Sequence, residues 1–271
     1  MKDLKVVISS PIDSNLYSLL VNHLCLKEHG IFICGIITLK TLSLKRIKSE
    51  YKRIGRSLFV KILNKFFVSN PNKNLLSMSS NSKIAYEDLK FNSLKAMADK
   101  YCVPYIKVDD LNSNKTVDFL IKNKPDLILS IGSTIIKKPI LEVPTIGVLN
   151  VHMGILPEYR GMGVTEWPLI ENRVNEIGLG VTLHLMDSNV DTGPIIKKKY
   201  INIDGFTSLD DIESRYLDEM VNLMIEGVKM ARDKKLSSEP QKNNDIDSGR
   251  QYYSAHRRMR IIAEKRLLEL K

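Results

Sequence analysis

The chain has 271 residues, of which 43% are hydrophobic and 27% charged, and these values exclude a disordered or fibrous protein. No run approaches the roughly 18 to 20 apolar residues that a membrane-spanning helix needs, and the N-terminus lacks the apolar core of a signal peptide, so a cytoplasmic protein without a membrane span is expected. The net charge of +10 would suit RNA, an anionic membrane or a phosphorylated small molecule, although a solvated lysine-rich surface explains it more simply.

The first part of the chain alternates short apolar runs with helical patterns. Strands are predicted at 5–10 and 31–39, and between them the leucines of 15–28 recur at helical spacing. A strand–helix–strand unit of this size is typical of a parallel sheet covered by helices. The alternation resumes further on, with predicted helices at 86–101 and 114–123 and predicted strands at 104–108 and 126–131.

Residues 40–82 interrupt this alternation. The stretch 44–67 is basic and amphipathic, and the serines and asparagines of 69–82 have the composition of a flexible segment. The pattern predicts an insertion that consists of a helix and a mobile loop on the surface of the sheet.

The second half of the chain continues the sheet and then becomes helical. Strands are predicted at 147–152, 180–186 and 195–201, with a short helical turn at 139–141. Ser208 with Asp211 three residues later has the pattern of a capping box, and the helix that it opens runs to about Lys234. A polar linker at 236–248 then leads to a last basic helix at 251–270, which could pack on the domain, bind a partner molecule or form a homodimer contact.

Together these elements predict an α/β fold. It is a Rossmann-like, mostly parallel sheet with helices on both faces, followed by a helical C-terminal tail. Residues 1–204 are expected to form the main domain, including the insertion at about 40–82, and residues 205–271 a helical C-terminal extension. In such a sheet ligands bind at the carboxyl ends of the strands.

Polar side chains of three kinds are expected to meet at that edge. Asn150 and His152 are two residues apart at the end of an apolar strand, so their side chains leave the strand on the same face. A loop punctuated by glycine and proline follows them. Further on, the acidic loop 187–194 lies between two apolar strands, and Asp191 in it can fold back to reach His152.

An asparagine, a histidine and an aspartate at one site suit acyl transfer to an amine. The histidine can hold or donate a proton near neutral pH, and a neighbouring carboxylate fixes its orientation. The asparagine amide can donate to the oxyanion of a tetrahedral intermediate, an interaction worth about 3 to 4 kcal/mol elsewhere. Each part also has a structural interpretation, because an isolated Asn-x-His pair can be packing and an Asp-x-Gly can be a turn.

In their order and context these motifs closely resemble those of the folate-dependent formyltransferase family. That family includes methionyl-tRNA formyltransferase, glycinamide ribonucleotide formyltransferase and the sugar-nucleotide N-formyltransferases. The matching motifs are Asn150, His152, Leu156-Pro157, Arg160-Gly161, Gly180-Val181-Thr182 and Asp191-Thr192-Gly193-Pro194. Two features depart from the family: Gly154 stands where a serine is usual, and the spacing from His152 to Asp191 is a few residues longer.

The resemblance implies a role for each matched position. Asn150 and His152 would stabilise the tetrahedral intermediate and handle the proton, while Asp191 would orient His152 and stabilise its charged form. The formyl donor would be N10-formyltetrahydrofolate as a co-substrate, and no metal is implied. The residues implied to contact the folate are Gly154, Ile155, Leu156 and Pro157, and those implied to line its pterin pocket, mostly through backbone, are Thr134, Ile135, Ile136, Asp187, Ser188, Asn189 and Val190.

The acceptor amine is expected to belong to an amino-sugar nucleotide, on the way to an N-formylated surface glycan. The family's tRNA enzyme carries a separate C-terminal β-barrel, whereas this chain has a helical tail. The glycinamide ribonucleotide enzyme has a glycine-rich turn that lets backbone approach a phosphate, and here Pro11-Ile12-Asp13 replaces it. Both enzymes remain the alternatives within the family.

An alternative of another class is a non-catalytic protein on the same fold that binds nucleic acid or a membrane surface. The complete set of Asn150, His152 and Asp191 argues against it, and nucleic acid is not expected as a partner. His184 alternates along a strand and is interpreted as a packing residue. Trp167 could wall the cleft or anchor the core, and Tyr252 and Tyr253 could stack on a base or form a packing cluster.

Overall fold

A computed structural model describes residues 2–40, 80–132, 135–241 and 250–270 of the chain. The predicted insertion at 40–82 therefore lies almost entirely outside the described residues, and the linker at 236–248 lies outside them from residue 242 on. Within those ranges, no helix has both the length and the apolar character that crossing a bilayer requires.

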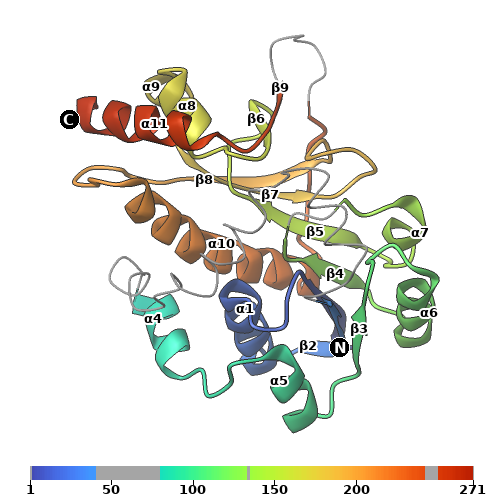
Figure 1. Cartoon of the computed structure of the whole chain (residues 1–271). Helices are drawn as coiled ribbons and strands as arrows, with labels where there is room; N and C mark the ends of the chain where they lie inside the picture. The colour runs from blue at the N-terminus through green and yellow to red at the C-terminus, as the bar shows by residue number, and fades with distance from the viewer. Residues whose placement is uncertain (1, 41–79, 133–134, 242–249, 271) are drawn as a thin grey trace.

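The centre of the molecule is a seven-stranded sheet in the order β3-β2-β1-β4-β5-β7-β8 (Figure 1). Its five strands from β1 to β5 pair in parallel, and β7 and β8 then add to β5 as an antiparallel edge. The predicted mostly parallel Rossmann-like sheet is thereby confirmed. The strands are β1 (Leu4–Ser10), β2 (Ile31–Leu39), β3 (Tyr105–Val108), β4 (Leu127–Ser130), β5 (Gly147–His152), β7 (Gly180–Leu185) and β8 (Ile195–Tyr200).

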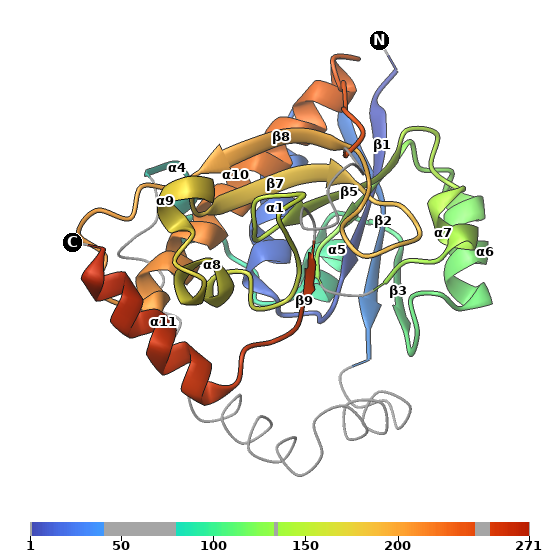
Figure 2. The same ribbon diagram turned by 90° about the horizontal axis from the view of Figure 1, so that it is seen from above.

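Helices cover both faces of the sheet (Figures 1 and 2). Alternate residues of a strand point to opposite faces, and accordingly Val6 and Ile8 join one core cluster while Val7 joins the other. The larger cluster lies under α1 (Leu16–Lys27), α4 (Ser80–Glu87), α5 (Leu94–Lys100) and α10 (Leu209–Arg232). The smaller lies under α6 (Asn114–Asn123) and α7 (Lys138–Leu141).

The C-terminal part of the chain returns to the loop that follows β5. There β6 (Tyr159–Gly161) pairs in parallel with β9 (Arg250–Tyr252), and α11 (Arg257–Glu269) packs against α8 (Glu166–Ile170). The short α9 (Val174–Ile177) completes this region, which Figure 1 shows at one end of the molecule beside β7 and β8. Segments about ninety residues apart in the sequence thus lie side by side near the end of β5.

Two predicted helices differ in the structure. The helix predicted at 86–101 is two helices, because the Ser93 side chain accepts a hydrogen bond from Ala96 N and begins α5 as a new N-cap. The last helix begins at Arg257 rather than at residue 251, because residues 250–252 form β9 and the His256 side chain caps α11. Sequence patterning also missed β6, α8 and α9, which are too short to show a period.

Helix α10 opens as predicted, with a capping box formed by Ser208 and Asp211. It packs closely on the sheet, since a Cβ added at Gly227 would lie 2.8 Å from Leu183 and 2.9 Å from Leu149. The proposed division of the chain at residue 204/205 therefore precedes a helix that contributes to the main core, and it stays a prediction.

Candidate functional site

Strand pairing places Asn150 and His152 at the carboxyl end of β5. Antiparallel pairing sets Asn150 opposite His184 of β7 and His152 opposite Thr182. The side chains of Asn150 and His152 are buried, and Asn150 Nδ2 donates a hydrogen bond to His184 Nε2 at 3.0 Å. The two residues named from the Asn-x-His motif therefore share one face at the strand end.

Asp191 reaches the same place from the loop between β7 and β8. Its Oδ2 lies 3.4 Å from His152 Nδ1 and accepts a hydrogen bond from Gly161 N at 2.9 Å. The residue has φ +53°, a left-handed conformation that aspartate tolerates better than most residues. Two residues on, a Cβ at Gly193 would lie 1.8 Å from Leu185 O, so only glycine allows this approach of the loop to β7. The loop closure that the sequence interpretation requires is present.

Both ring nitrogens of His152 face oxygen acceptors. Nε2 donates to the carbonyl oxygen of Tyr159 at 2.8 Å, while Nδ1 faces the Asp191 carboxylate. These two contacts hold the plane of the imidazole and allow it to carry a proton on either nitrogen. A group that approaches the ring can exchange a proton with Nε2 only by displacing Tyr159 O.

His184, interpreted from the sequence as a packing residue, is buried, and its ring also hydrogen-bonds to Asn150. Its Nδ1 donates to Leu185 O at 3.0 Å, which leaves Nε2 as the acceptor for Asn150. Burial and the neighbouring His152 lower the pKa of His184, so the ring is neutral at physiological pH. His184 Nε2 accepts a hydrogen bond from one N–H of the Asn150 amide, and the second N–H can donate to another partner.

The sequence carried no signal for this role. A histidine in the middle of an apolar strand looks the same whether it packs or binds, and only the pairing of β5 with β7 sets it opposite Asn150.

The side chain of Thr182 on β7 holds the predicted folate loop at 154–157 by two hydrogen bonds. Its Oγ1 donates to Gly154 O at 2.6 Å and accepts from Leu156 N at 3.1 Å. Ile155 and Leu156 are buried as whole residues, backbone included, so the contacts of this loop with folate stay a prediction. Pro157 is half-buried and follows a cis peptide bond.

The remaining residues predicted for the pterin pocket differ in exposure. Ile135 is 56% exposed, Ile136 is buried in the smaller core cluster, and Thr134 lies outside the described residues. In the loop after β7, Asp187 accepts hydrogen bonds from Asn189 N and Thr192 Oγ1 and so shapes the turn. Ser188 and Asn189 are exposed and Val190 is half-buried. Their contacts with folate stay predictions.

Aromatic side chains of β6, α8 and β9 pack together in a small cluster. The Tyr159 and Tyr252 hydroxyls both donate to the Glu171 carboxylate at 2.9 Å, and burial followed by this carboxylate raises the pKa of each phenol. Trp167 packs on Tyr252 and donates to Tyr253 O. Tyr252 is therefore a packing residue, whereas Tyr253 is 72% exposed.

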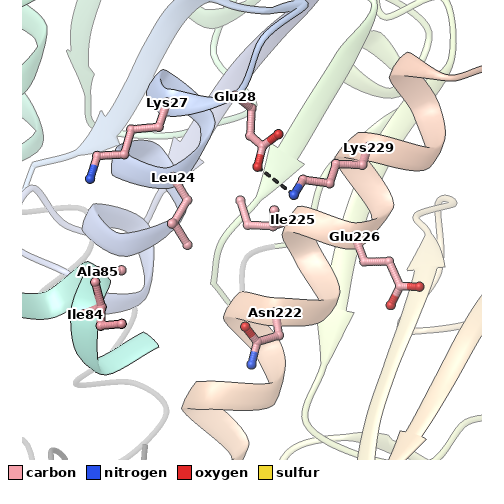
Figure 3. A pocket seen from close by; sticks show the side chains of 9 residues that line it. All are labelled: Leu24, Lys27, Glu28, Ile84, Ala85, Asn222, Ile225, Glu226 and Lys229. Carbon is pink, nitrogen blue, oxygen red and sulfur yellow. Dashed lines mark ion pairs between the residues drawn. The ribbon is translucent and has the colours of Figure 1, made fainter. Parts of the chain in front are cut away.

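A separate hollow of about 500 Å³ opens between α1, α4 and α10 (Figure 3). Leu24, Ile84 and Ile225 supply its apolar wall, and Glu28 forms an ion pair of 2.6 Å with Lys229 on its rim. None of the described site residues lines this hollow. The hollow is therefore separate from the candidate site, which lies at the carboxyl end of β5.

Residues 50–228 match the family model described as formyl transferase. Among sequence relatives, the methionyl-tRNA formyltransferase of Thermotoga maritima is 34% identical over 135 residues, which are 49% of this chain and 42% of that protein. The chain thus matches less than half the length of this relative.

Solved structures share the fold. The N-formyltransferase from Helicobacter canadensis, solved with folinic acid and dTDP-3-aminofucose, is 18% identical, with a TM-score of 0.56 over 98% of this chain and 80% of that one. Glycinamide ribonucleotide transformylase 1 from Symbiobacterium toebii is 14% identical, with a TM-score of 0.56 over 89% of this chain and 95% of that one.

Proposed function

The chain belongs to the formyl transferase family, and from that premise we propose that it moves a formyl group from N10-formyltetrahydrofolate, as co-substrate, to a primary amine. The observation that carries the proposal is the meeting of Asn150, His152 and Asp191 at the end of β5, with His152 Nδ1 3.4 Å from the carboxylate. These are the groups that acyl transfer to an amine needs: an oxyanion donor, a proton carrier and an orienting carboxylate.

In the proposed mechanism the lone pair of the acceptor amine forms a bond to the formyl carbon, and the bond from that carbon to N10 then breaks. Negative charge develops on the formyl oxygen, and Asn150 meets it with the N–H that His184 does not hold. The attacking amine loses a proton and the departing nitrogen gains one. His152 would carry this proton on Nε2, which must leave Tyr159 O to reach the substrate, while Asp191 keeps its place beside Nδ1.

The residues around the trio fit a folate co-substrate. The loops 154–157 and 187–190 would hold the pterin, and Pro157, Ser188 and Asn189 are among their residues that are open to a ligand. The exposed side chains of Met153 and Ile135 supply apolar surface for a flat ring. The folate would bring the activated formyl group, while the polar contacts come from this chain.

An amino-sugar nucleotide is the acceptor class that we favour. Asp13 stands in the loop after β1, where its carboxylate accepts from Lys95 N at 3.0 Å and from Tyr105 OH at 3.1 Å. A fixed negative charge there disfavours the phosphate monoester of glycinamide ribonucleotide. The Helicobacter canadensis enzyme, which shares the fold over 98% of this chain, was solved with a dTDP-linked aminosugar. A net charge of +10 suits such a diphosphate.

A second candidate acceptor is methionyl-tRNA. It is favoured by the 34% identity to the Thermotoga maritima enzyme over 135 residues, and the same positive charge would attract a nucleic acid backbone. The two candidates use the same formyl donor and the same trio, so they differ only in the acceptor.

The acceptor is tested by incubating the protein with N10-formyltetrahydrofolate and a panel of dTDP- and UDP-linked aminosugars, methionyl-tRNA and glycinamide ribonucleotide, and following product mass. Formylation of an aminosugar nucleotide is expected. Turnover of the tRNA or of glycinamide ribonucleotide with none of the sugars would overturn the choice.

The same assay tests the trio. The His152→Ala variant is expected to lose transfer by about 10²- to 10⁴-fold, the range for removal of a general acid–base group, while folate binding followed by tryptophan fluorescence or calorimetry persists. His29→Ala, which changes an exposed histidine in the turn after α1, serves as the matched control and should keep full activity. Full activity of His152→Ala would place the chemistry elsewhere.

A further inference from the structure

Gln241 lies far from the trio in sequence, yet its side chain spans two parts of the site. Its Nε2 donates to Asp191 O at 2.9 Å and to Gly193 O at 2.8 Å, and its Oε1 accepts from Arg160 Nη2 at 3.0 Å. The Gln241 amide thus links the loop backbone at Asp191 and Gly193 to Arg160 of β6.

The strand β6 in turn contacts the trio through its backbone. Tyr159 O accepts from His152 Nε2, and Gly161 N donates to Asp191 Oδ2. Arg160, which lies between these two residues, is the one that binds Gln241. A displacement of the Asp191 loop relative to β6 would therefore lengthen the Gly161 contact and turn the carboxylate away from His152.

The main chain next to Gln241 is anchored independently. Glu239 and Ile195 exchange two backbone hydrogen bonds, Ile195 N to Glu239 O at 2.8 Å and Glu239 N to Ile195 O at 2.7 Å. Gln241 is thereby fixed at the start of β8, and its side chain reaches across the loop from a rigid position. The loop needs such support because Asp191 has φ +53°, a conformation that costs a non-glycine residue free energy.

We propose that Gln241 is a positioning residue of the transfer reaction, which holds the Asp191 loop against β6 so that the carboxylate faces His152. The inference rests on the proposed function, because the reaction that it serves is formyl transfer. It assigns the C-terminal segment around residues 239–241 to the active site, although Gln241 itself contacts neither the His152 ring nor the Asp191 carboxylate by any hydrogen bond described in the structure.

The test uses Gln241→Met, which keeps the length of the side chain and removes both donors and the acceptor. Gln241→Glu is the second variant, because it keeps an acceptor for Arg160 but loses the donors to Asp191 O and Gly193 O. Gln251→Met makes the same chemical change at an exposed position of β9 and is the matched control. Melting temperatures report whether each variant is folded.

Kinetics of the folded variants separate positioning from general destabilisation. Both Gln241 variants are expected to lower kcat by about 10- to 100-fold, since small misplacements of catalytic groups cost this much, with KM for donor and acceptor within about threefold of wild type. In a background that already carries Asp191→Asn, Gln241→Met should change kcat by less than about twofold, because the effect passes through Asp191. Independent, multiplicative losses in the double variant would overturn the proposal.

Hydrogen exchange gives a readout that does not depend on turnover. Amide exchange measured by mass spectrometry on the full chain should quicken in peptides covering 159–163 and 187–194 in Gln241→Met, and remain at the wild-type rate in peptides from β1 and α1 and in Gln251→Met. If wild-type protein formylates no acceptor but these peptides still loosen, the proposed function fails, and only the support of the Asp191 loop by Gln241 stands. Unchanged exchange in both peptides would refute the positioning role whatever the activity.

Discussion

At the scale of single residues, the orientation of the Asn150 amide depends on a histidine of the neighbouring strand. The pKa of His184 is lowered mainly by burial, so the ring is neutral and accepts at Nε2 from the Asn150 amide. An amide held by one N–H points its other N–H in a fixed direction, which is what preorganised oxyanion stabilisation requires. Without the acceptor the amide can rotate.

We therefore expect His184→Leu to lower kcat by about 10- to 100-fold, within the range for loss of one oxyanion donor, with little effect on KM for the folate. His184→Gln should recover part of the rate, because its carbonyl oxygen can accept from Asn150 Nδ2. His23→Leu changes another buried histidine, on α1, and controls for the loss of a buried ring. Steady-state kinetics decide: equal rates for His184→Leu and wild type would remove His184 from the site.

Gly154 is the second residue whose environment yields a prediction. A Cβ at this position would lie 2.9 Å from His152 Nε2 and 3.0 Å from Tyr159 O, the two atoms of a hydrogen bond in the site. Gly154→Ser introduces the side chain usual in the family, and yet it should crowd this hydrogen bond and lower kcat/KM by about tenfold or more, as misplacement of a catalytic group does. A kinetic assay checks this, with Ser237→Ala, an exposed position after α10, as a control for a small change away from the site. A variant as active as wild type would show that the loop can move away without cost.

At the scale of elements, the start of α10 depends on a carboxylate that accepts from backbone. Asp211 Oδ2 accepts from Thr207 N at 2.9 Å and from Ser208 N at 3.0 Å, and the hydrogen bond from Thr207 is the main cause of the lowered pKa of Asp211. The same helix contributes much of the larger core through residues such as Ile212 and Tyr216. The cap therefore affects the stability of the whole domain.

The lowered pKa of Asp211 sets the sign of a pH effect. A carboxyl group whose pKa is lower in the folded protein stabilises it above the ordinary value of 3.8, and this contribution disappears as the pH falls through the folded pKa. We expect Asp211→Asn to lower the free energy of unfolding by about 1 kcal/mol at neutral pH, as for loss of a capping interaction, with the difference shrinking below pH 3.8. Denaturant titrations of wild type and variant, at neutral pH and below pH 3.8, measure the difference in the free energy of unfolding. A pH-independent difference for Asp211→Asn would contradict the assignment.

At the scale of the whole molecule, charge should act on the acceptor. With a net charge of +10, association of a diphosphate-linked substrate should be favoured by long-range attraction that salt screens. The screening length falls from about 30 Å at 0.01 M to about 3 Å at 1 M ionic strength. We expect kcat/KM for an aminosugar nucleotide to fall by about tenfold over this range, the lower end of reported steering effects.

The control for charge is the same aminosugar without its nucleoside diphosphate, assayed with the same folate donor. Its kcat/KM should change by no more than about twofold over the same salt range, because it lacks the anionic group that the field attracts. An equal loss for both acceptors would assign the salt effect to the folate or to the fold rather than to recognition of the diphosphate.

The fold class could be read from local patterns. The strands at 31–39 and 147–152 and the helix at 114–123 have in the structure the bounds that the patterns predict, because long apolar runs and helical spacing are properties of adjacent residues. The helix predicted at 86–101 was wrong because Ser93 starts a new cap in its middle, and short pieces such as β6 carry no period at all.

The sequence by itself indicated a mostly parallel sheet and named Asn150, His152 and Asp191 as candidates, because apolar runs and short motifs are local properties of the chain. Only the tertiary structure decided that His184 supports Asn150, that Tyr159 O and Gly161 N bind His152 and Asp191, and that Gln241 lies across the loop. Those contacts join residues up to about eighty positions apart, as between Arg160 and Gln241. They follow from strand pairing and close packing, which no single stretch of sequence specifies.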